Sequence, residues 1–146
     1  MTKRNSLTFA LGLALLLSLS MRGAAQKQPT SLEATARGEG RLVVGRDEAK
    51  ISAVVVVLRK NGDAEITLIT VAQVLVRGKW SGGDPDKGIG LEITGGDVSG
   101  NAKGTGMLFL DKEGKKIVKL TMRGETTTGT KFEAEFVAEK ADPAPR

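Results

Sequence analysis

Apolar residues recur at every second position along most of this chain, and this period constrains its fold more than any other feature. The pattern runs from Leu32 to Glu139, and no stretch within it repeats with the 3.6-residue period of a helix. In a β-strand this alternation places apolar side chains on one face and polar side chains on the other. The sequence therefore predicts an all-β domain.

Short connections with turn chemistry separate the apolar segments. Asn61-Gly62 and the glycine that ends Asp111–Gly114 supply the left-handed backbone positions that hairpins need. Eight strands joined in chain order by short turns make an antiparallel meander, which we expect to close into a small barrel, with a β-sandwich as the alternative. The predicted strands are Leu32–Val44, Ala49–Arg59, Ala64–Thr70, Gln73–Trp80, Gly88–Thr94, Ala102–Leu110, Lys116–Gly124 and Lys131–Glu139.

The last hairpin specifies its own register. If its turn is centred on Thr128, Leu120 faces Phe136 on an apolar side, while Arg123 faces Glu133 on a charged side. A slip of one residue would expose the aromatic ring and bury the carboxylate. We therefore predict this pairing.

Two segments of the chain resemble each other at an offset of 66 residues. Residues 36–44 and 102–110 share alanine, two glycines in a Gly-x-Gly pattern, and leucine at matching positions, followed by matching lysine and isoleucine residues. One interpretation is an internal repeat that arose by duplication. The other is that Gly-x-Gly before an apolar strand is a recurrent way to bend a sheet.

The N-terminus has the features of a secretory signal peptide. Lys3 and Arg4 precede the apolar run Leu7–Leu19, and small residues precede an expected cleavage between Ala25 and Gln26. The apolar run has thirteen residues, well short of the roughly 20 that span a bilayer. We expect an exported protein, periplasmic or secreted.

The domain organisation follows from this leader. We expect a signal peptide over residues 1–25, a flexible linker over 26–31, one β-domain over 32–140 and a disordered tail over 141–146. Removing the leader removes three of the 22 cationic residues and none of the 17 acidic ones, so the net charge falls from +5 to +2. A nearly neutral chain lacks the basic surface that nucleic-acid binding requires. We expect no nucleic-acid partner.

The composition also limits the chemistry. The chain has no His, Cys or Tyr, which excludes disulfides, thiolate nucleophiles, the usual zinc sites and histidine acid–base relays. Four aromatic residues remain after the leader, too few for the interfacial girdles of a membrane barrel. We therefore expect no membrane insertion after signal cleavage, no cofactor and no enzymatic activity.

One candidate ligand site surrounds the only tryptophan. Trp80 ends the fourth predicted strand, with Arg77 and Lys79 alternating beside it. Two interpretations stay open: a binding rim in which Trp80 forms an apolar wall and a cation orients an anion, or a tryptophan that caps the core with both cations in solvent on the opposite face. The segment Gly78-Lys79-Trp80 is similar to the Gly-x-Trp signature of the calycins, the lipocalin and avidin barrels that hold small ligands. In those families the motif lies on the first strand, so the resemblance transfers no site residue to this chain.

The loop that follows offers a weaker candidate for a cation site. Asp84 and Asp86, with Asp97 in a neighbouring turn, carry oxygens that bind Ca²⁺, but such a site needs six to eight ligands. Ordinary turn chemistry accounts for the same spacing.

The consecutive apolar residues Ala53–Leu58 in the second strand suggest an interface. The candidate interface residues are Ile51, Val54, Val55, Val56, Val57 and Leu58. Such a strand is either covered on both faces within the fold, or presents one face, Ile51/Val55/Val57 or Val54/Val56/Leu58, to a partner subunit. The second interpretation predicts a homodimer.

Together these features predict an exported, non-catalytic β-barrel that binds a small apolar ligand or, at its rim, a protein partner. The alternative is a structural or interaction module, either a self-assembling subunit or an inhibitor of a secreted enzyme. Whether the interior is filled or hollow distinguishes the two.

Overall fold

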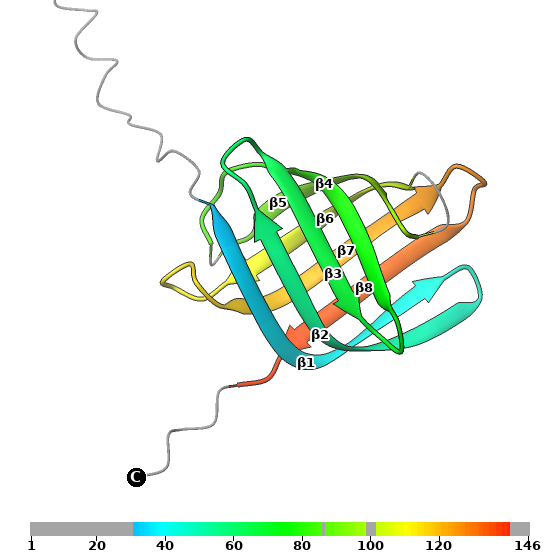
Figure 1. Cartoon of the computed structure of the whole chain (residues 1–146), viewed down its shortest axis with the longest axis horizontal. Coiled ribbons are helices and arrows are strands. Elements are labelled where there is room, and N and C mark those ends of the chain that lie inside the picture. Colours follow the sequence, from blue (N-terminus) through cyan, green and yellow to red (C-terminus); the bar gives the residue numbers. More distant parts are fainter. Residues whose placement is uncertain (1–30, 86, 99–101, 141–146) are drawn as a thin grey trace, which may run out of the picture.

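The chain forms a closed antiparallel barrel of eight strands in consecutive order (Figure 1). The computed structural model describes residues 31–85, 87–98 and 102–140. The predicted leader, its Ala25–Gln26 cleavage site, nearly all of the linker and the tail lie outside these residues. The strands are β1 (Leu32–Val44), β2 (Asp47–Leu58), β3 (Asp63–Ile69), β4 (Gln73–Trp80), β5 (Ile89–Gly96), β6 (Ala102–Leu110), β7 (Ile117–Thr126) and β8 (Lys131–Ala138).

The all-β meander predicted from the sequence is confirmed, and the barrel is the correct choice over the sandwich. Each strand pairs with its neighbours in the chain, and β1 pairs with β8 to close the ring. The last hairpin has the predicted register, with Leu120 opposite Phe136 and Arg123 opposite Glu133. All strand ends lie within two residues of the predicted ends.

Strand β1 bends sharply and takes part in both sides of the barrel. Its first half, up to Arg37, pairs with β2 alone, whereas residues from Gly38 onward also pair with β8. A β-bulge lies at the bend, between Arg37 and Gly40. A Cβ atom on Gly38 would lie 2.1 Å from the carbonyl oxygen of Val137. Glycine is therefore required where the two strands approach most closely.

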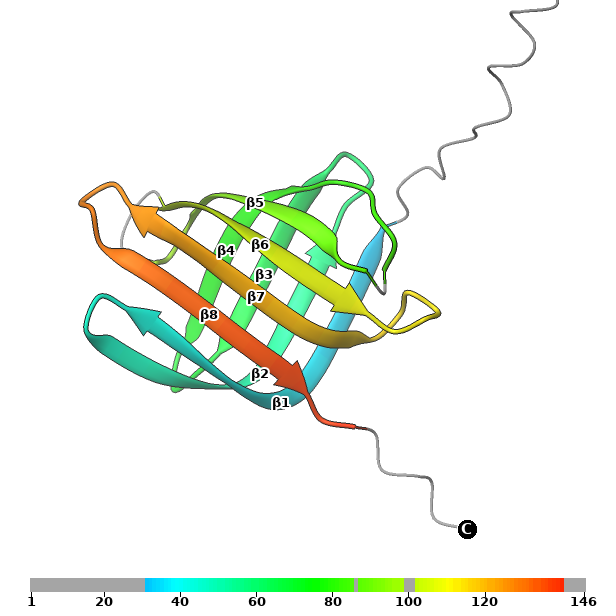
Figure 2. The same cartoon turned by 180° about the vertical axis from the view of Figure 1, so that it is seen from behind.

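The bend divides the barrel wall into two layers whose strands run across each other. The first half of β1 lies with β2, β3 and β4 in the layer nearest the viewer in Figure 1. The view from behind shows β6, β7 and β8 in the opposite layer, with the second half of β1 beside β8 (Figure 2). Below we call these the front layer and the back layer.

The two similar Gly-x-Gly segments are not related by a symmetry of the barrel. They lie on β1 and β6, and an internal repeat with an offset of 66 residues would make β2 correspond to β7 in the same way. β1 and β6 run in opposite directions, since neighbouring strands alternate throughout the ring. A rotation that reverses strand direction also reverses strand order, so no rotation superposes the two halves in chain order. The barrel favours the second interpretation, in which the same bending pattern is used twice.

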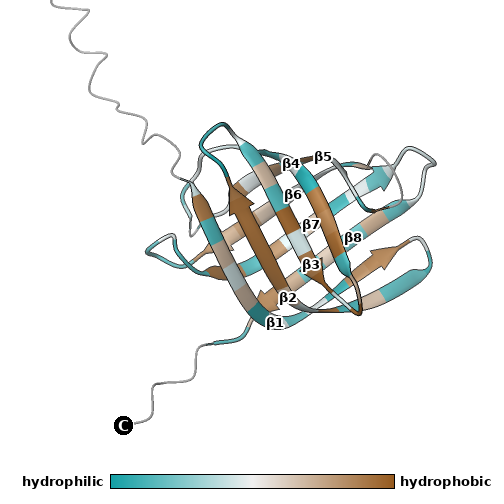
Figure 3. Cartoon of the chain, in the orientation of Figure 1, coloured by the Kyte–Doolittle hydropathy of each residue, from teal (hydrophilic) through white to brown (hydrophobic). Residues whose placement is uncertain are grey.

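The interior is an apolar core to which all eight strands contribute. The residues buried there include Ile51, Val54, Val56, Leu58, Ile66, Leu68, Leu108, Leu120, Met122, Phe132 and Phe136. Val, Ile and Phe suit strands because branched and aromatic side chains pack well on a pleated surface. Coloured by hydropathy, β2 is brown along the half that ends at Leu58 (Figure 3).

Candidate functional site

The interior of the barrel is packed rather than hollow in the region that the structure describes. Phe136, Ile51, Leu68 and Leu108 each have at most 1% of their surface exposed, and they belong to one continuous cluster of buried apolar side chains. Among the small residues on the inner face, Ala134 belongs to this cluster and Ala138 packs against it. A barrel of eight strands has an interior just wide enough for side chains to fill. Any binding surface must therefore be sought on the outside.

Trp80 lies at the end of β4 and packs its ring against the core. It pairs with Leu91 of β5, a buried residue, so its side chain is directed inward. The indole Nε1–H donates a hydrogen bond to the carbonyl oxygen of Arg59, 2.9 Å away, in the turn between β2 and β3. Tryptophan here closes one end of the barrel while its polar atom is satisfied.

Arg77 and Lys79 alternate with Trp80 and lie on the outer face. Arg77 approaches Glu65 of β3 at 4.0 Å, and Lys79 pairs with Asp63. Lys79 and Trp80 line one shallow pocket with Glu92, but Arg77 lies outside it, so the structure does not gather Trp80 and both cations at one rim. It places them as in the second interpretation, with the tryptophan on the core and both cations on the opposite face.

The pair between Lys79 and Asp63 has an electrostatic consequence. A hydrogen bond from Lys79, and then one from the side-chain amide of Asn61, holds the pKa of Asp63 below its ordinary value. Both members of the pair are substantially exposed, so the pair is a solvated link between β3 and β4.

The described residues between β4 and β5 contact the end of β6. The carbonyl oxygen of Pro85 accepts a hydrogen bond of 2.8 Å from the backbone N–H of Leu110, at the end of β6. The carboxylate of Asp84 lies 3.4 Å from the ammonium group of Lys87, and that of Asp97 accepts a hydrogen bond from the backbone N–H of Leu75. Asp86 lies outside the described residues. Within residues 31–85, 87–98 and 102–140, no three acidic side chains gather as a metal site would require.

The apolar run of β2 is divided between the two faces of the barrel wall. Ile51, Val54, Val56 and Leu58 are buried in the core, so the alternation of β2 shifts by one residue between Ile51 and Val54, at the same place where its register against β1 shifts. Neither of the two predicted outward sets is present as such. Of the six residues named for an interface, Val55 and Val57 are the ones on the outer surface, where they are half-buried.

These two valines belong to a wider apolar surface on the front layer. Val55 pairs with Thr67, which pairs in turn with Leu75, and in the next row Ala53 pairs with Ile69. We call this surface, which comprises Ala53, Val55, Val57, Ile69 and Leu75, the apolar face. Only Val55 and Val57 of this face were predicted from the sequence, because the alternation of one strand does not show which outward residues of β3 and β4 lie beside it.

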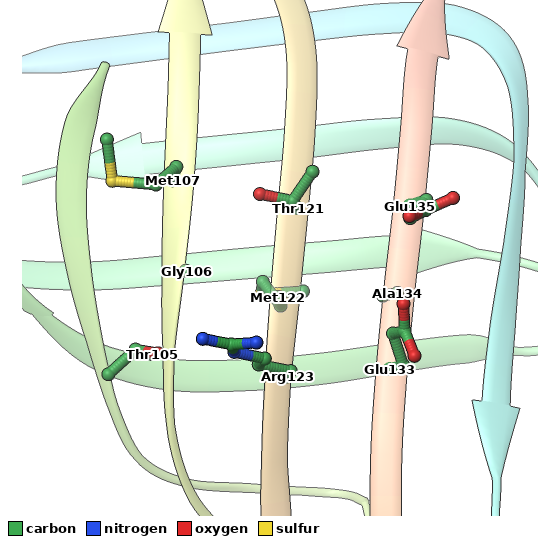
Figure 4. Close-up of a pocket in the computed structure, with 9 residues that line it drawn as sticks. All are labelled: Thr105, Gly106, Met107, Thr121, Met122, Arg123, Glu133, Ala134 and Glu135. Atoms are coloured by element: carbon green, nitrogen blue, oxygen red, sulfur yellow. The ribbon is translucent and has the colours of Figure 1, made fainter.

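A second external feature, a shallow groove of about 350 Å³, lies over β6, β7 and β8 (Figure 4). Its sides carry Thr105, Arg123, Glu133 and Glu135. Arg123 extends toward Thr105, and no ion pair within 4.0 Å joins it to Glu133 in the described part of the chain. The groove is open, and nothing in its geometry brings the two carboxylates together for acid–base chemistry.

Comparisons with known proteins found no match to this chain. No family model matches it, and no curated protein and no solved structure matches it. Among the described residues, no helix is long and apolar enough to cross a membrane. The class that the structure defines is that of small, closed, eight-stranded antiparallel β-barrels.

Proposed function

We propose that this chain is an exported, non-catalytic interaction module whose barrel acts through its outer wall. The observation that carries the proposal is the contrast between a filled interior and a half-buried apolar face outside it. Side chains occupy the space in which a ligand-binding barrel would hold its ligand. Export is part of the proposal through the leader pattern of Lys3, Arg4 and Leu7–Leu19.

The apolar face is the surface at which we place the contact. Val55 and Ile69 are large apolar residues on the outer side of neighbouring strands of the front layer, whereas the outer side of the back layer mixes Arg123, Glu133 and Glu135 with separate apolar residues such as Met107 and Val137. Exposed apolar surface that is gathered in one place marks an interaction site more often than scattered single residues do.

The partner we propose is a second copy of this chain. The border of the face carries both signs of charge: Arg59 pairs with Glu65 at 3.2 Å, and Arg37 and Glu33 lie on the neighbouring strand. A copy of the same surface provides the same apolar centre and, after a two-fold rotation, can match positive with negative positions. This gives the predicted homodimer a defined surface.

The mass of the secreted form in solution tests the proposal. We expect an oligomer at micromolar concentration by sedimentation velocity, and Val55→Lys should lower its mass by removing the apolar-face contact, because a buried ammonium group in an apolar contact is unfavourable. Thr94→Lys, an exposed position on the outer side of β5, is the matched control and should leave the wild-type mass unchanged.

Native mass spectrometry of protein purified from its export compartment separates this proposal from a ligand carrier. We expect a mass that is a whole multiple of the bare chain. An additional mass lost on denaturation would instead reveal a bound small molecule and would overturn the proposal. A wild-type chain that stays monomeric, or a Val55→Lys variant that still dimerises through this surface, would overturn it as well.

A further inference from the structure

The first half of β1 has one unpaired edge. Residues 32–37 pair with β2 along their whole length, but the pairing of β1 with β8 begins only at Gly38. Within the described residues, no strand lies on the other side of residues 32–36. In Figure 1 this half of β1, in blue, is the outermost strand of the front layer. A closed barrel normally leaves no such edge.

The backbone groups at this edge point outward from the sheet. The carbonyl oxygen of Arg37 accepts a hydrogen bond of 2.8 Å from the N–H of Glu139, on the side away from β2. The N–H and C=O groups of successive residues in a strand point alternately to its two sides. Thr35 and Glu33 therefore also direct their N–H and C=O groups away from β2.

The chain's own tail is a poor occupant for this edge. The register that places residue 139 opposite Arg37 would place residue 141 opposite Thr35 and residue 143 opposite Glu33. Residue 143 is proline, which has no N–H to donate at the position where the ladder needs a donor.

The charges on the edge favour an antiparallel copy of the same strand. Glu33 and Arg37 lie on the outer face on either side of Thr35. When two copies of this segment pair antiparallel about a two-fold axis near Thr35, Glu33 of each lies beside Arg37 of the other, directly or diagonally. Opposite charges at such positions stabilise a strand pair, and like charges destabilise it.

The inner side of the edge is also self-complementary. Leu32, Ala34 and Ala36 face inward and pack against the core while only partly buried. A second β1 strand alongside would bring its own three apolar side chains against them, so the exposed parts of both sets would be covered together. Edge pairing would therefore extend the core as well as the ladder.

We propose that two copies of this chain join edge to edge through residues 32–37 of β1, in an antiparallel β-ladder that continues the front layer of one barrel into the other. This contact is separate from the apolar face and does not rest on it. It makes the assembly capable of two different two-fold contacts, which give a closed tetramer if their axes cross at right angles and a larger or open assembly otherwise.

Thr35→Pro tests the edge with little risk to the fold. Because the N–H of Thr35 points away from β2, proline at this position removes no hydrogen bond within the chain, and proline is tolerated at strand edges. It removes one donor from each copy in the ladder and should raise the dissociation constant of the edge contact by at least about tenfold. Thr35→Val, which keeps the N–H and the branched shape, is the control, and circular dichroism verifies that both variants fold.

Sedimentation velocity on four proteins distinguishes the edge from the apolar face. If both contacts form, the wild type is a tetramer or a larger assembly, Thr35→Pro and Val55→Lys are each dimers, and the double variant is a monomer. If only the apolar face associates, Thr35→Pro has the wild-type mass and the edge proposal is overturned. If only the edge associates, Val55→Lys stays a dimer, so the edge proposal holds while the apolar-face proposal fails.

Charge reversal supplies a second, independent test of the edge. Glu33→Arg places two cations side by side in the edge pair and should weaken it, and so should Arg37→Glu. The double variant Glu33→Arg/Arg37→Glu restores opposite charges and should recover association at low salt. A double variant that is weaker than either single variant would contradict the antiparallel pairing.

Discussion

The front and back layers of this barrel solve the same packing problem with different residues. In the front layer, β2 places valine and isoleucine at its inner positions, such as Val54 and Val56. In the back layer, glycine occupies inner positions, and Gly104 of β6 lies directly opposite Gly124 of β7. The ring of Phe132 covers Gly124, at 2.7 Å from where a Cβ atom would be. The back layer therefore replaces side chains near the backbone with rings that reach across from the next strand.

This difference between the layers shows which residues the barrel fold requires and which residues it does not require. Closing a sheet into a barrel needs sharply coiled strands, and glycines permit this coiling. Aromatic rings then fill the space that the missing glycine side chains leave in the interior. The inner residues of both layers are explained in this way. The outer surface is not, because the back layer combines charged outer residues such as Arg123 and Glu133 with separate exposed apolar residues such as Val137 in the same barrel. What sets the apolar face apart is that its residues lie on three neighbouring strands of the front layer.

The prediction with the largest expected effect on stability concerns the removal of an aromatic ring from the back layer. Phe136 is 1% exposed, and its ring lies 2.9 Å from where a Cβ atom of Gly38 would be. Phe136→Ala empties the space over that glycine and should lower the free energy of unfolding by about 3–5 kcal/mol. Urea unfolding followed by tryptophan fluorescence measures the change.

The neighbouring residue provides the control for this cavity. Val137 has 55% of its surface exposed on the outer side of the same strand. Val137→Ala should change stability by less than about 0.5 kcal/mol. Similar costs for the two substitutions would contradict the inward and outward assignment of β8.

A second test asks whether the back-layer glycines are required by close approach. A Cβ atom on Gly104 would lie 2.2 Å from the carbonyl oxygen of Arg123, a backbone atom that can move only with its strand. Gly104→Ala should therefore destabilise the barrel by about 1–3 kcal/mol. The same urea titration applies.

Gly95 on β5 is the matched control for this substitution. A Cβ atom there would meet nothing within 4 Å, and its backbone does not have a positive φ. Gly95→Ala should be neutral or stabilising by up to about 1 kcal/mol, because alanine restricts the unfolded chain. Equal destabilisation of the two variants would show that strand flexibility, rather than close approach, explains the glycines.

Most of the fold could be predicted because alternation and turn chemistry are local signals. The last hairpin could be placed in register from the sequence since a slip would bury Glu133 and expose Phe136. The division of the apolar residues of β2 between the inner and outer faces could not be predicted. It coincides with a bulge in β1, where two residues oppose one, and Ile51 lies in the core together with Val54. Ser52 and Ala53 both lie outside the core, and the apolar run that begins at Ala53 does not show from the sequence where this shift occurs.

The candidate surfaces were less predictable because they are assembled across strands. Trp80 and Lys79 are adjacent in the sequence, yet the pleat puts one on the core and the other in solvent. The apolar face needs the pairing of Val55 with Thr67 and of Thr67 with Leu75, which only the register gives. The free edge of β1 depends on where β8 ends relative to the bend.

The smallest test concerns the solvated charges at the outer side of the front layer. The pKa of Asp63 is held below its ordinary value of about 3.9, first by the hydrogen bond from Lys79 and then by that from Asn61. A carboxyl group whose pKa is lower in the folded state adds stability that is complete above its unfolded pKa. That stability is lost as the pH falls through the folded value. Unfolding midpoints of the wild type should therefore drop more steeply than those of Asp63→Asn as the pH is lowered from about 5 toward 3.

Lys79→Gln removes the other half of the pair and provides the matched comparison. Its pH profile should resemble that of Asp63→Asn, and the double variant should add little, since both substitutions remove one interaction. The wild-type advantage at neutral pH should also shrink in 1 M salt, because both groups are exposed and screened. Parallel pH profiles for the wild type and Asp63→Asn would show that this link contributes nothing to joining β3 and β4. The packed inner faces alone would then hold the front layer together.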